Sequence, residues 1–431
     1  MSQTSHQQQA SPTERADVLV IGGGISGLSF ALKAAQAGKR VTVLERAGRL
    51  GGCIHSERAK SGYWFELGAH TAYNSYGGFL DLAIAAAAVP SMRERGPARG
   101  VIGFLRDGVY KWLTPPKVLL ELSWLEAALH LPQAVFGSAA GKTISERFSA
   151  MVGKDNYRRV LGPFLSAVPS QRADDLPAAG PGSLFKKRPR RKEFLRSFGF
   201  DGGLQLVCDG VARTPGITVV HGAVAILLTP ESGAEGSGMR AVCEDGRSFA
   251  ARTVAVASGP KEATALLRPS FPALAEATAA IETVELDSVG VVLPREKAWM
   301  PACAFLVPAE DSFFSCVTRD PFPDEKERAF AFHFRPGLER AARLRRVCEV
   351  LRVTEQDFAW LAEKRLTLPS PGRDHAAKIA AIDLALARPS GSGSALLALT
   401  GNYFEGLAIE DCVQRSFSEW ARVAGALVGR G

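Results

Sequence analysis

Apolar residues near the start of the chain change from a strand-like to a helix-like pattern and back within one short stretch. Residues 17–21 form a β-branched apolar run, which is typical of a buried strand. Over 25–37 the apolar residues return at helical spacing, and Gly38 is placed to end that helix in the left-handed conformation. Residues 40–45 are again strand-like. The pattern predicts a β-α-β unit and, with it, a parallel sheet.

The rest of the chain divides into a mostly helical middle, about 79–196, and sheet-rich later parts. Strand-like runs occur at 217–220, 224–228, 251–257, 287–293, 302–307, 313–317, 330–334 and 395–400. A Gly-rich segment at 231–238 is typical of a hairpin loop, and we expect helices at 337–351 and from about 410.

The composition is that of a globular protein. The 431 residues are 46% hydrophobic and 22% charged, which fits two or three domains and excludes fibrous and disordered classes. Residues 1–16 are polar and are expected to form a disordered tail without a signal sequence. No apolar run is long enough for a membrane span. The seven cysteines include no CxxC pair and the histidines show no metal spacing, so we expect a reducing, cytoplasmic setting and no metal.

The net charge of +8 is concentrated in one segment. Between residues 181 and 200 stand seven Lys or Arg and one Glu, mostly within 186–196. This segment either contacts an anionic lipid surface at the inner face of the cell membrane, guides an acidic substrate, or is a solvated loop. No nucleic-acid motif accompanies it. The apolar-rich stretch 118–136 has two interpretations: a membrane contact, or core and pocket wall, which we favour from the sequence.

A glycine motif follows the first predicted strand and opens the first predicted helix. Gly22-x-Gly24-x-x-Gly27 has the spacing of a dinucleotide-binding turn, with Ile25 and Ser26 in the first helical turn. The helix amino end stabilises phosphate charge. Glu45, at the end of the next strand, is placed to accept hydrogen bonds from ribose hydroxyls, which disfavours a 2′-phosphate.

The residues after Glu45 resemble a known family. Arg46-x-x-Arg49-x-Gly51-Gly52-Cys53 is similar to the extended signature of the flavin amine oxidase superfamily, which includes protoporphyrinogen oxidases and carotenoid desaturases. The resemblance implies FAD as the cofactor, with Arg49 reaching the pyrophosphate and the two glycines beside the flavin. Amine oxidases usually have Arg where this chain has Cys53.

Two further segments resemble protoporphyrinogen oxidases in particular. Phe65-Glu-Leu-Gly68-Ala69-His70 is similar to their F-E-L-G-P segment at the flavin ring. Leu399–Cys412 is similar to their carboxy-terminal flavin motif, which implies that the flavin-facing residues are Gly401, Asn402, Leu407, Ala408 and Ile409. Val224 matches the residue whose backbone meets adenine. His70 is either a flavin or substrate contact or a packed histidine.

The chain departs from the family around the substrate pocket. The family's G-P-F-x-S-G-V-Y stretch reads here as residues 162–169, with Ala167 in place of glycine and Phe164 beside it. We take Ala167, Phe164 and His70 as pocket candidates and assign no catalytic base. Arg99 is the candidate for a porphyrinogen carboxylate, and Arg106 is expected to be a solvated surface residue.

These observations predict an α/β fold with a Rossmann-like FAD-binding domain of the amine oxidase type and a discontinuous substrate domain of mixed sheet plus helices. The expected parts are an FAD-binding domain at 17–78, 200–285 and 376–431, a helical substrate- or membrane-facing region at 79–199, and a substrate-domain sheet and helix at 286–375.

The resemblance implies a flavoenzyme that oxidises a small molecule, a porphyrinogen, in haem biosynthesis. One alternative is a flavin amine oxidase or desaturase acting on another substrate. The absence of Lys from residues 287–293 disfavours the amine oxidase, since many of these enzymes place a Lys there. Another alternative is a flavin-bearing binding protein without turnover.

Overall fold

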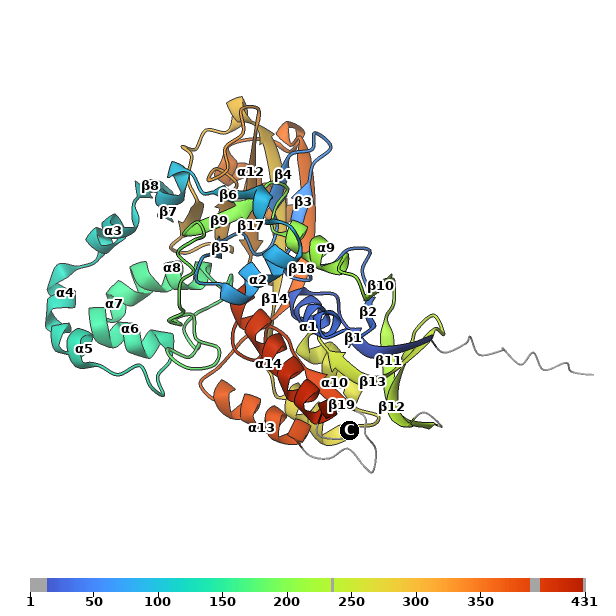
Figure 1. Ribbon diagram of the computed structural model, residues 1–431. Helices are drawn as coiled ribbons and strands as arrows, with labels where there is room; N and C mark the ends of the chain where they lie inside the picture. The colour runs from blue at the N-terminus through green and yellow to red at the C-terminus, as the bar shows by residue number, and fades with distance from the viewer. Residues whose placement is uncertain (1–13, 234–235, 388–395, 429–431) are drawn as a thin grey trace, which may run out of the picture.

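The computed structural model describes residues 14–233, 236–387 and 396–428. Two seven-stranded sheets form separate layers, and a lobe of short helices extends from one side (Figure 1). The predicted tail boundary is wrong, because residues 14–16 belong to the first strand, where Glu14 pairs with Phe249.

The first sheet has the order β10-β2-β1-β13-β12-β11, with β19 also paired to β13. Its strands are β1 (Glu14–Ile21), β2 (Val41–Glu45), β10 (Ile217–His221), β11 (Ala225–Gly233), β12 (Gly236–Cys243), β13 (Ser248–Val256) and β19 (Leu396–Leu399). β1 runs parallel to β2 and to β13, which confirms the predicted β-α-β unit. The predicted loop at 231–238 is mostly strand, because β11 and β12 continue into it on both sides of the undescribed residues 234–235.

Helices cover both faces of this sheet. In β1, Val18 and Val20 face a cluster with α1 (Ile25–Gln36) and α14 (Ile409–Val428), while Leu19 and Ile21 face the opposite layer. That opposite layer contains α10 (Pro260–Leu267), α11 (Pro272–Ala279) and α13 (His375–Ala387). The alternation of β1 between two apolar layers explains why its sequence is a continuous apolar run.

The second sheet has the order β18-β14-β17-β16-β15-β7-β8. Its strands are β7 (Ile102–Arg106), β8 (Val109–Leu113), β14 (Thr283–Pro294), β15 (Phe305–Pro308), β16 (Phe313–Thr318), β17 (Glu327–Phe334) and β18 (Trp360–Pro369). One face packs on α12 (Arg340–Leu351) through Val289 and Val291. The alternate residues Ser288 and Gly290 face the other way, and Gly290 packs against Phe65. The sheet therefore presents one face to the segment with the flavin-type motif.

Smaller elements join the two layers. These are the strands β3 (Ser56–Arg58), β4 (Trp64–Glu66), β5 (Ala72–Tyr73), β6 (Met92–Glu94) and β9 (Ser197–Phe200), the helices α2 (Gly77–Ala85) and α9 (Gln205–Ala212), and the 3-10 turns η1 (Val89–Ser91), η2 (Pro97–Gly100), η5 (Arg295–Lys297) and η6 (Glu355–Asp357).

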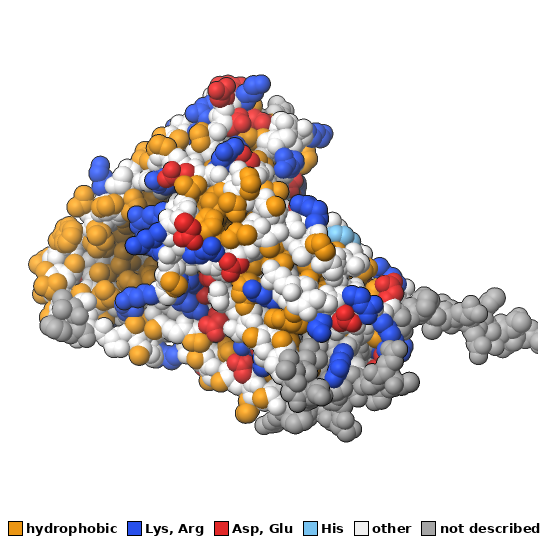
Figure 2. All heavy atoms as spheres, in the orientation of Figure 1, with side chains coloured by type: hydrophobic (Ala, Val, Ile, Leu, Met, Phe, Trp, Pro, Cys, Tyr) orange, Lys and Arg blue, Asp and Glu red, His pale blue; other side chains and the backbone are white. Residues whose placement is uncertain are grey.

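The lateral lobe consists of α3 (Pro115–Val118), η3 (Leu119–Glu121), α4 (Trp124–Leu129), α5 (Leu131–Phe136), α6 (Ile144–Val152), α7 (Lys154–Asn156), the π-helical turn η4 (Tyr157–Leu161) and α8 (Gly162–Ala167). The favoured interpretation of residues 118–136 as core or pocket wall holds for Val118 and Leu122, which are buried, but is wrong for most of the other large apolar residues. Leu125 and Leu129 are 78% and 76% exposed, and their neighbours Leu119, Leu120, Trp124 and Leu131 are exposed as well. Figure 2 shows this hydrophobic side of the lobe.

The basic segment 186–196 is partly neutralised within the fold. Arg188 donates a 2.6 Å hydrogen bond to buried Asp411 of α14, and Arg191 donates one of 2.8 Å to Asp81 of α2. The segment therefore fastens the lateral region to the first layer at these points, which accounts for part of its charge. No helix of the described residues is long and apolar enough to cross a membrane.

Candidate functional site

Two glycines make the turn after β1 possible. Gly22 has φ +112°, and a Cβ there would lie 2.8 Å from the carbonyl oxygen of Ala257. A Cβ on Gly27 would overlap the carbonyl oxygen of Gly22. Larger residues at either position would push α1 away from the strand ends, so these glycines set the close packing that the motif predicts.

Gly24 has a different environment. It caps α1, and a Cβ there would meet only Cα of Gly52, at 3.8 Å. The two glycine loops lie side by side, since Gly51 donates a 2.9 Å hydrogen bond to the carbonyl of Gly23. Gly52 is exposed. The amino end of α1 and two glycine backbones thus form an accessible cradle, which fits the diphosphate of a dinucleotide.

Glu45 closes the end of this cradle. Its carboxylate is buried and accepts hydrogen bonds from the backbone N–H groups of Gly23 at 2.7 Å and Ala47 at 2.8 Å. A carboxylate has about four acceptor positions, so acceptors remain for ribose hydroxyls. Ala223 donates a 3.0 Å hydrogen bond to the Glu45 carbonyl, which brings the half-exposed Val224 next to it. These positions fit the adenosine end of FAD.

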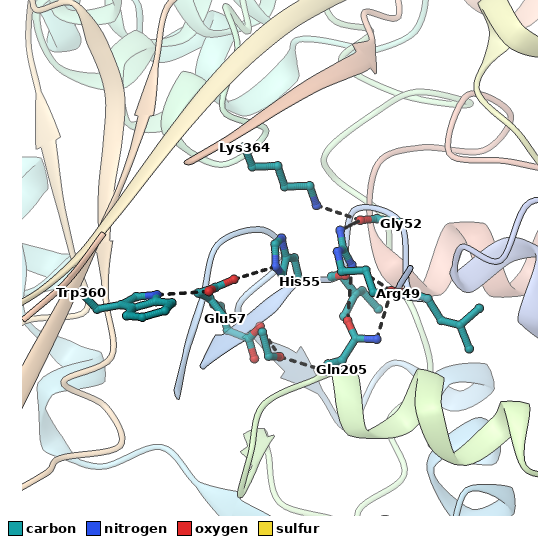
Figure 3. A network of polar contacts seen from close by, with 11 residues as sticks. Arg49, Gly52, His55, Glu57, Gln205, Trp360 and Lys364 are labelled. Atoms are coloured by element: carbon teal, nitrogen blue, oxygen red, sulfur yellow. Dashed lines mark hydrogen bonds and ion pairs between the residues drawn. The ribbon is translucent and has the colours of Figure 1, made fainter. Parts of the chain in front are cut away.

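Arg49 holds together the second glycine loop, residues 49–55. Its guanidinium donates to the carbonyls of Leu50 at 2.8 Å, Ile54 at 3.0 Å and Gly52 at 2.8 Å (Figure 3). Gln205 also donates to the Leu50 carbonyl, at 3.0 Å. Burial lowers the pKa of Arg49. The side chain expected at the pyrophosphate therefore binds the loop that forms one wall of the cradle.

Lys364 reaches this loop from the second sheet. Its ammonium group donates a 2.8 Å hydrogen bond to the same Gly52 carbonyl that Arg49 contacts (Figure 3). Burial, together with the positive charge of Arg49, lowers the pKa of Lys364 to about 8. A lysine with this pKa exchanges a proton near neutral pH, which is the range that acid–base catalysis needs.

A buried polar pair lies on the strands next to Lys364. Ser288 of β14 stands opposite Lys364 in the strand register, and its hydroxyl lies 2.9 Å from Nδ1 of His333 on β17. Burial lowers the pKa of His333 to about 4, so this ring is neutral at neutral pH. Lys364, Ser288 and His333 thus occupy adjacent strands on the face of the sheet that is turned toward the glycine loops.

The network continues to the edge of this sheet. Glu57 accepts a 3.1 Å hydrogen bond from Trp360 of β18, and it lies 3.0 Å from Nε2 of His55 (Figure 3). Burial lowers the pKa of His55 to about 3. The loop 49–55 is therefore tied to the second sheet at two points, Lys364 and Trp360.

The carboxy-terminal motif meets the second glycine loop. Asn402 lies next to Cys53, with Nδ2 3.8 Å from Sγ. Leu407 and Ala408 immediately precede α14, and Ile409 begins it. The amino ends of α1 and α14 therefore both approach the glycine loops, where their positive ends stabilise anionic groups. A Cβ on Gly401 would lie 2.6 Å from the ring of Tyr403, so the turn needs glycine.

The segment 65–70 also passes close to this loop. A Cβ on Gly68 would overlap the carbonyl oxygen of Cys53, and Ala69 donates a 3.4 Å hydrogen bond to that oxygen. Nδ1 of His70 lies 2.8 Å from Oγ1 of Thr71. Burial lowers the pKa of His70 to about 3, so the ring stays neutral.

Several candidate residues lie elsewhere. Arg46 is exposed and pairs with Glu262 at 3.3 Å. Arg99 is exposed, pairs with Glu94 at 3.1 Å and donates to the Arg95 carbonyl, so the structure does not bring it to the cradle.

The other pocket candidates lie on α8, which contacts the second sheet at β15 and β16. Phe164 stacks at a tilt on Phe104, with ring centroids 5.2 Å apart, and Ala167 is the last residue of α8. Arg106 is half-buried and lies 3.7 Å from Asp107, so its expected full solvation is only partly met.

The most important residues that the sequence did not reveal are Lys364, Ser288 and His333. Lys364 lies in β18, where residues 363–365 are all charged, and no strand was expected there. Only the strand register places it beside Ser288. Among the described residues, no group of His, Cys, Asp and Glu could hold a metal ion.

Comparisons with known proteins agree with a Rossmann-like fold at the start of the chain. Residues 20–82 match the family of NAD(P)-binding Rossmann-like domains. A stretch of 57 residues, 13% of the chain, is 49% identical to human all-trans-retinol 13,14-reductase but covers only 9% of that protein. The chain therefore spans about a tenth of this curated relative.

Solved structures match almost end to end. A proposed protoporphyrinogen oxidase from Exiguobacterium sp. 255-15 has a TM-score of 0.74 at 17% identity and covers 96% of this chain and 99% of that one. Cyclohexylamine oxidase from Brevibacterium oxydans has a TM-score of 0.68 at 16% identity, covering 96% and 99%. The predicted fold, with a Rossmann-like domain at the start of the chain, is confirmed.

Proposed function

We propose that this chain is an FAD-dependent oxidoreductase of the protoporphyrinogen oxidase type, which oxidises a porphyrinogen to a porphyrin in haem biosynthesis in the cytoplasm. One arrangement carries the proposal. The two glycine loops lie side by side at the amino ends of α1 and α14, and Lys364 on the polar face of the second sheet donates a hydrogen bond to one of these loops. Similarity of the segments 65–70 and 399–412 to protoporphyrinogen oxidases favours a tetrapyrrole substrate.

The residues present fit FAD along the whole cradle. Glu45 would hold the ribose, the backbone at Gly24 and Gly52 would face the diphosphate, and the amino end of α14 at Ile409 would face the flavin. Bound FAD would supply a hydride acceptor at N5, and dioxygen or another acceptor would take up the electrons after each two-electron oxidation. The positive end of α14 would stabilise negative charge that develops beside it.

Proton transfer is assigned to the polar face of the second sheet. Lys364 has a pKa of about 8 and is the group best placed to take up or release a proton near neutral pH. Neutral His333 and Ser288 provide a hydrogen-bonding pair on the neighbouring strands. Substrate would lie between this face and the cradle, held in orientation while oxidation proceeds.

Porphyrin fluorescence tests this function. Purified protein with bound FAD, mixed in air with protoporphyrinogen, should form fluorescent porphyrin several-fold faster than autoxidation in a matched sample without protein. Rates equal to autoxidation would reject the porphyrinogen substrate.

A specific observation keeps a second candidate, a flavin amine oxidase. Residues 287–293 contain no Lys, yet β18 brings Lys364 opposite Ser288, and its ammonium group is hydrogen-bonded to the glycine loop. Cyclohexylamine oxidase is among the similar structures. A screen of amines for peroxide release distinguishes the candidates, since robust turnover of an amine without porphyrinogen oxidation would favour the second.

We also propose that the exposed side of α3–α5 contacts a lipid surface. It carries the six exposed Leu and Trp residues described above. Its acidic residues have partners: Glu121 pairs with Lys111 of β8 at 2.6 Å, and Glu126 accepts hydrogen bonds from the backbone N–H groups of Asp155 and Asn156. The exposed side of α3–α5 is therefore apolar, and it has no unpaired acidic group that would be repelled by an anionic lipid surface.

Liposome flotation tests this contact. The wild type should float with vesicles of anionic and neutral phospholipid, and Leu125→Glu with Leu129→Glu should abolish flotation while leaving bound FAD unchanged. A control with Lys187 and Arg190 changed to Glu measures the contribution of the basic segment. Flotation that survives the Leu changes would overturn the assignment to α3–α5.

A further inference from the structure

A cleft separate from the glycine loops lies between α1, α2, α14 and the basic segment 186–196. Its volume is about 490 Å³, within the range of about 300–1,000 Å³ that small-molecule sites occupy. Lys33 lines the cleft from the last turn of α1, eight residues after Ile25 at the amino end, where the diphosphate cradle lies. Eight residues of α-helix span about 12 Å, so the cleft and the cradle are different sites.

Two arginines of the basic segment line this cleft and keep free donor groups. Arg188 donates through Nη2 to Asp411 at 2.6 Å, while its Nε and Nη1 form no hydrogen bond with any described residue. Arg191 uses Nη1 for Asp81 and Nε for Glu193, and its Nη2 is likewise unengaged by the described part of the chain. Each guanidinium is therefore fixed by a carboxylate of the protein and presents its remaining donors to a ligand.

Lys33 and Phe417 form another part of the wall. The ammonium group of Lys33 lies 4.3 Å from the centroid of the Phe417 ring, and it forms no ion pair with a described residue. The ring holds in place a positive charge that no described carboxylate pairs with. Phe417 and Pro189 also give the cleft apolar surface, which suits a ligand with an organic body.

The acidic residues in the wall are already engaged. Asp81 belongs to the ion pair with Arg191. Buried Glu410 accepts hydrogen bonds from two backbone N–H groups at the start of α2, at 2.9 and 3.0 Å, and from Gln414 at 2.7 Å. Burial also raises the pKa of Glu410, which favours its uncharged form. These carboxyl groups therefore oppose an incoming anion only weakly.

Neighbouring residues of the basic segment add positive charge. Lys187, Arg190 and Lys192 adjoin the lining residues in the chain, are exposed and form no ion pair within the described ranges. A concave surface that carries one sign of charge concentrates ions of the opposite sign. The cleft therefore suits an anion.

The arrangement of the donors indicates which anion fits. They come from α1 and from the basic segment, so they approach a ligand from different directions. A carboxylate accepts through two oxygens in one plane, whereas a phosphate group has three strong acceptor oxygens that can meet one lysine and two arginines together. Beside one phosphate group, the volume of the cleft leaves room for an organic body against Phe417.

We propose that this cleft binds the phosphate group of an organic phosphate through Lys33, Arg188 and Arg191. Binding here requires no turnover at the flavin, so the site goes beyond the proposed function. A soluble phosphate monoester and the head group of an anionic phospholipid both supply this chemistry, and a comparison of the two as ligands distinguishes the sources.

Calorimetry on the full chain with bound FAD tests the site, because FAD keeps the diphosphate cradle occupied. Phenyl phosphate should bind, and benzoate, which carries a carboxylate on the same ring, should bind at least about tenfold more weakly. Dihexanoyl phosphatidylglycerol, used below its micelle concentration, supplies the lipid head group. Tighter binding of phenyl phosphate would identify a soluble monoester as the ligand, and tighter binding of the lipid would identify a head group.

Substitutions locate the binding. Lys33→Gln and Arg191→Gln should each weaken phenyl phosphate binding by about tenfold or more, because each removes a charge-assisted hydrogen bond. Arg188→Lys keeps a charge beside buried Asp411 but loses the planar fork, and it should weaken binding to a similar degree. Lys261→Gln is the matched control, since it removes an exposed lysine from α10, on the opposite face of the first sheet from α1, and should leave binding unchanged.

Retention of FAD and the thermal unfolding midpoint show that each variant is folded. No binding of either phosphate ligand to the wild type, equal affinity for benzoate and phenyl phosphate, or unchanged affinity in Lys33→Gln would each overturn the phosphate site. A loss in Lys261→Gln as large as that in Lys33→Gln would overturn it too, because binding would then follow net charge rather than this cleft.

Discussion

Replacement of Gly24 by alanine separates cofactor contact from protein packing. A Cβ at this position would meet only Cα of Gly52, at 3.8 Å, which is ordinary van der Waals contact. The backbone of Gly24, with φ −71° and ψ 174°, lies in the extended region that alanine also adopts. The apoprotein should therefore fold, and the loss of glycine as the helix cap should lower the free energy of unfolding by about 1 kcal/mol or less.

The effect on FAD should be larger. If the diphosphate lies on this backbone, the methyl group displaces it and weakens at least one hydrogen bond to a charged oxygen, worth about 1.5–3 kcal/mol. That corresponds to an FAD dissociation constant raised by about 10- to 100-fold. Quenching of FAD fluorescence during titration of apoprotein measures the constant, and urea unfolding of the apoprotein measures stability.

Two neighbouring glycines provide the controls. Gly48→Ala adds a methyl group with no protein atom within 4 Å, and it should leave both quantities unchanged. Gly27→Ala overlaps the Gly22 carbonyl and should lower both stability and FAD affinity. An unchanged FAD dissociation constant in Gly24→Ala would refute the assignment of this backbone to the diphosphate.

Three further substitutions probe other parts of the site. Lys364→Met should remove one contribution to the pH dependence of stability. The folded pKa of about 8 lies below the unfolded value of 10.5, so between these values folded Lys364 binds fewer protons than the unfolded residue. Urea unfolding of both apoproteins should therefore show the wild type gaining stability relative to the variant as pH rises, by at most about 3 kcal/mol, and a constant difference would contradict the lowered pKa. Arg49→Lys keeps the charge but loses the planar fork to three carbonyls, and should lower the free energy of unfolding of the apoprotein by about 1–3 kcal/mol; unchanged stability would remove Arg49 from its loop-forming role. Glu45→Gln places an amide donor against the N–H of Gly23 or Ala47 and should raise the FAD dissociation constant about tenfold or more, while an unchanged constant would count against a ribose contact.

The parts of the fold that the sequence predicted are those specified locally. The glycine turn follows from backbone constraints: Gly22 has a left-handed φ, and Gly27 faces a carbonyl that no Cβ could approach. The parallel β1–β2 pair follows from the β-α-β pattern, and Gly38 adopts φ +74° as predicted. These features depend on residues that are close together in the chain, so they can be predicted from a single sequence.

The parts that it did not predict depend on partners far away in the chain. β18 carries three consecutive charged residues and has no apolar alternation there, so its pairing with β14 could not be read locally. The apolar residues of 118–136 have helical spacing whether they face a core or a lipid surface, and only the structure shows that Val118 is buried whereas Leu125 and Leu129 are exposed. Arg95 and Arg99 are indistinguishable in sequence, yet Arg95 is half-buried and Arg99 is ion-paired at the surface.

The most direct test of the central proposal is a single turnover without oxygen. Protein with bound FAD is mixed anaerobically with protoporphyrinogen, and the flavin absorbance and the porphyrin fluorescence are followed together. We expect the oxidised flavin absorbance to disappear rapidly on mixing and porphyrin fluorescence to rise after dioxygen is admitted, because full oxidation of a porphyrinogen removes more electrons than one flavin accepts. A flavin that keeps its oxidised absorbance while protoporphyrinogen remains unoxidised would contradict the proposed reaction, whereas rapid bleaching would exclude a binding protein without turnover.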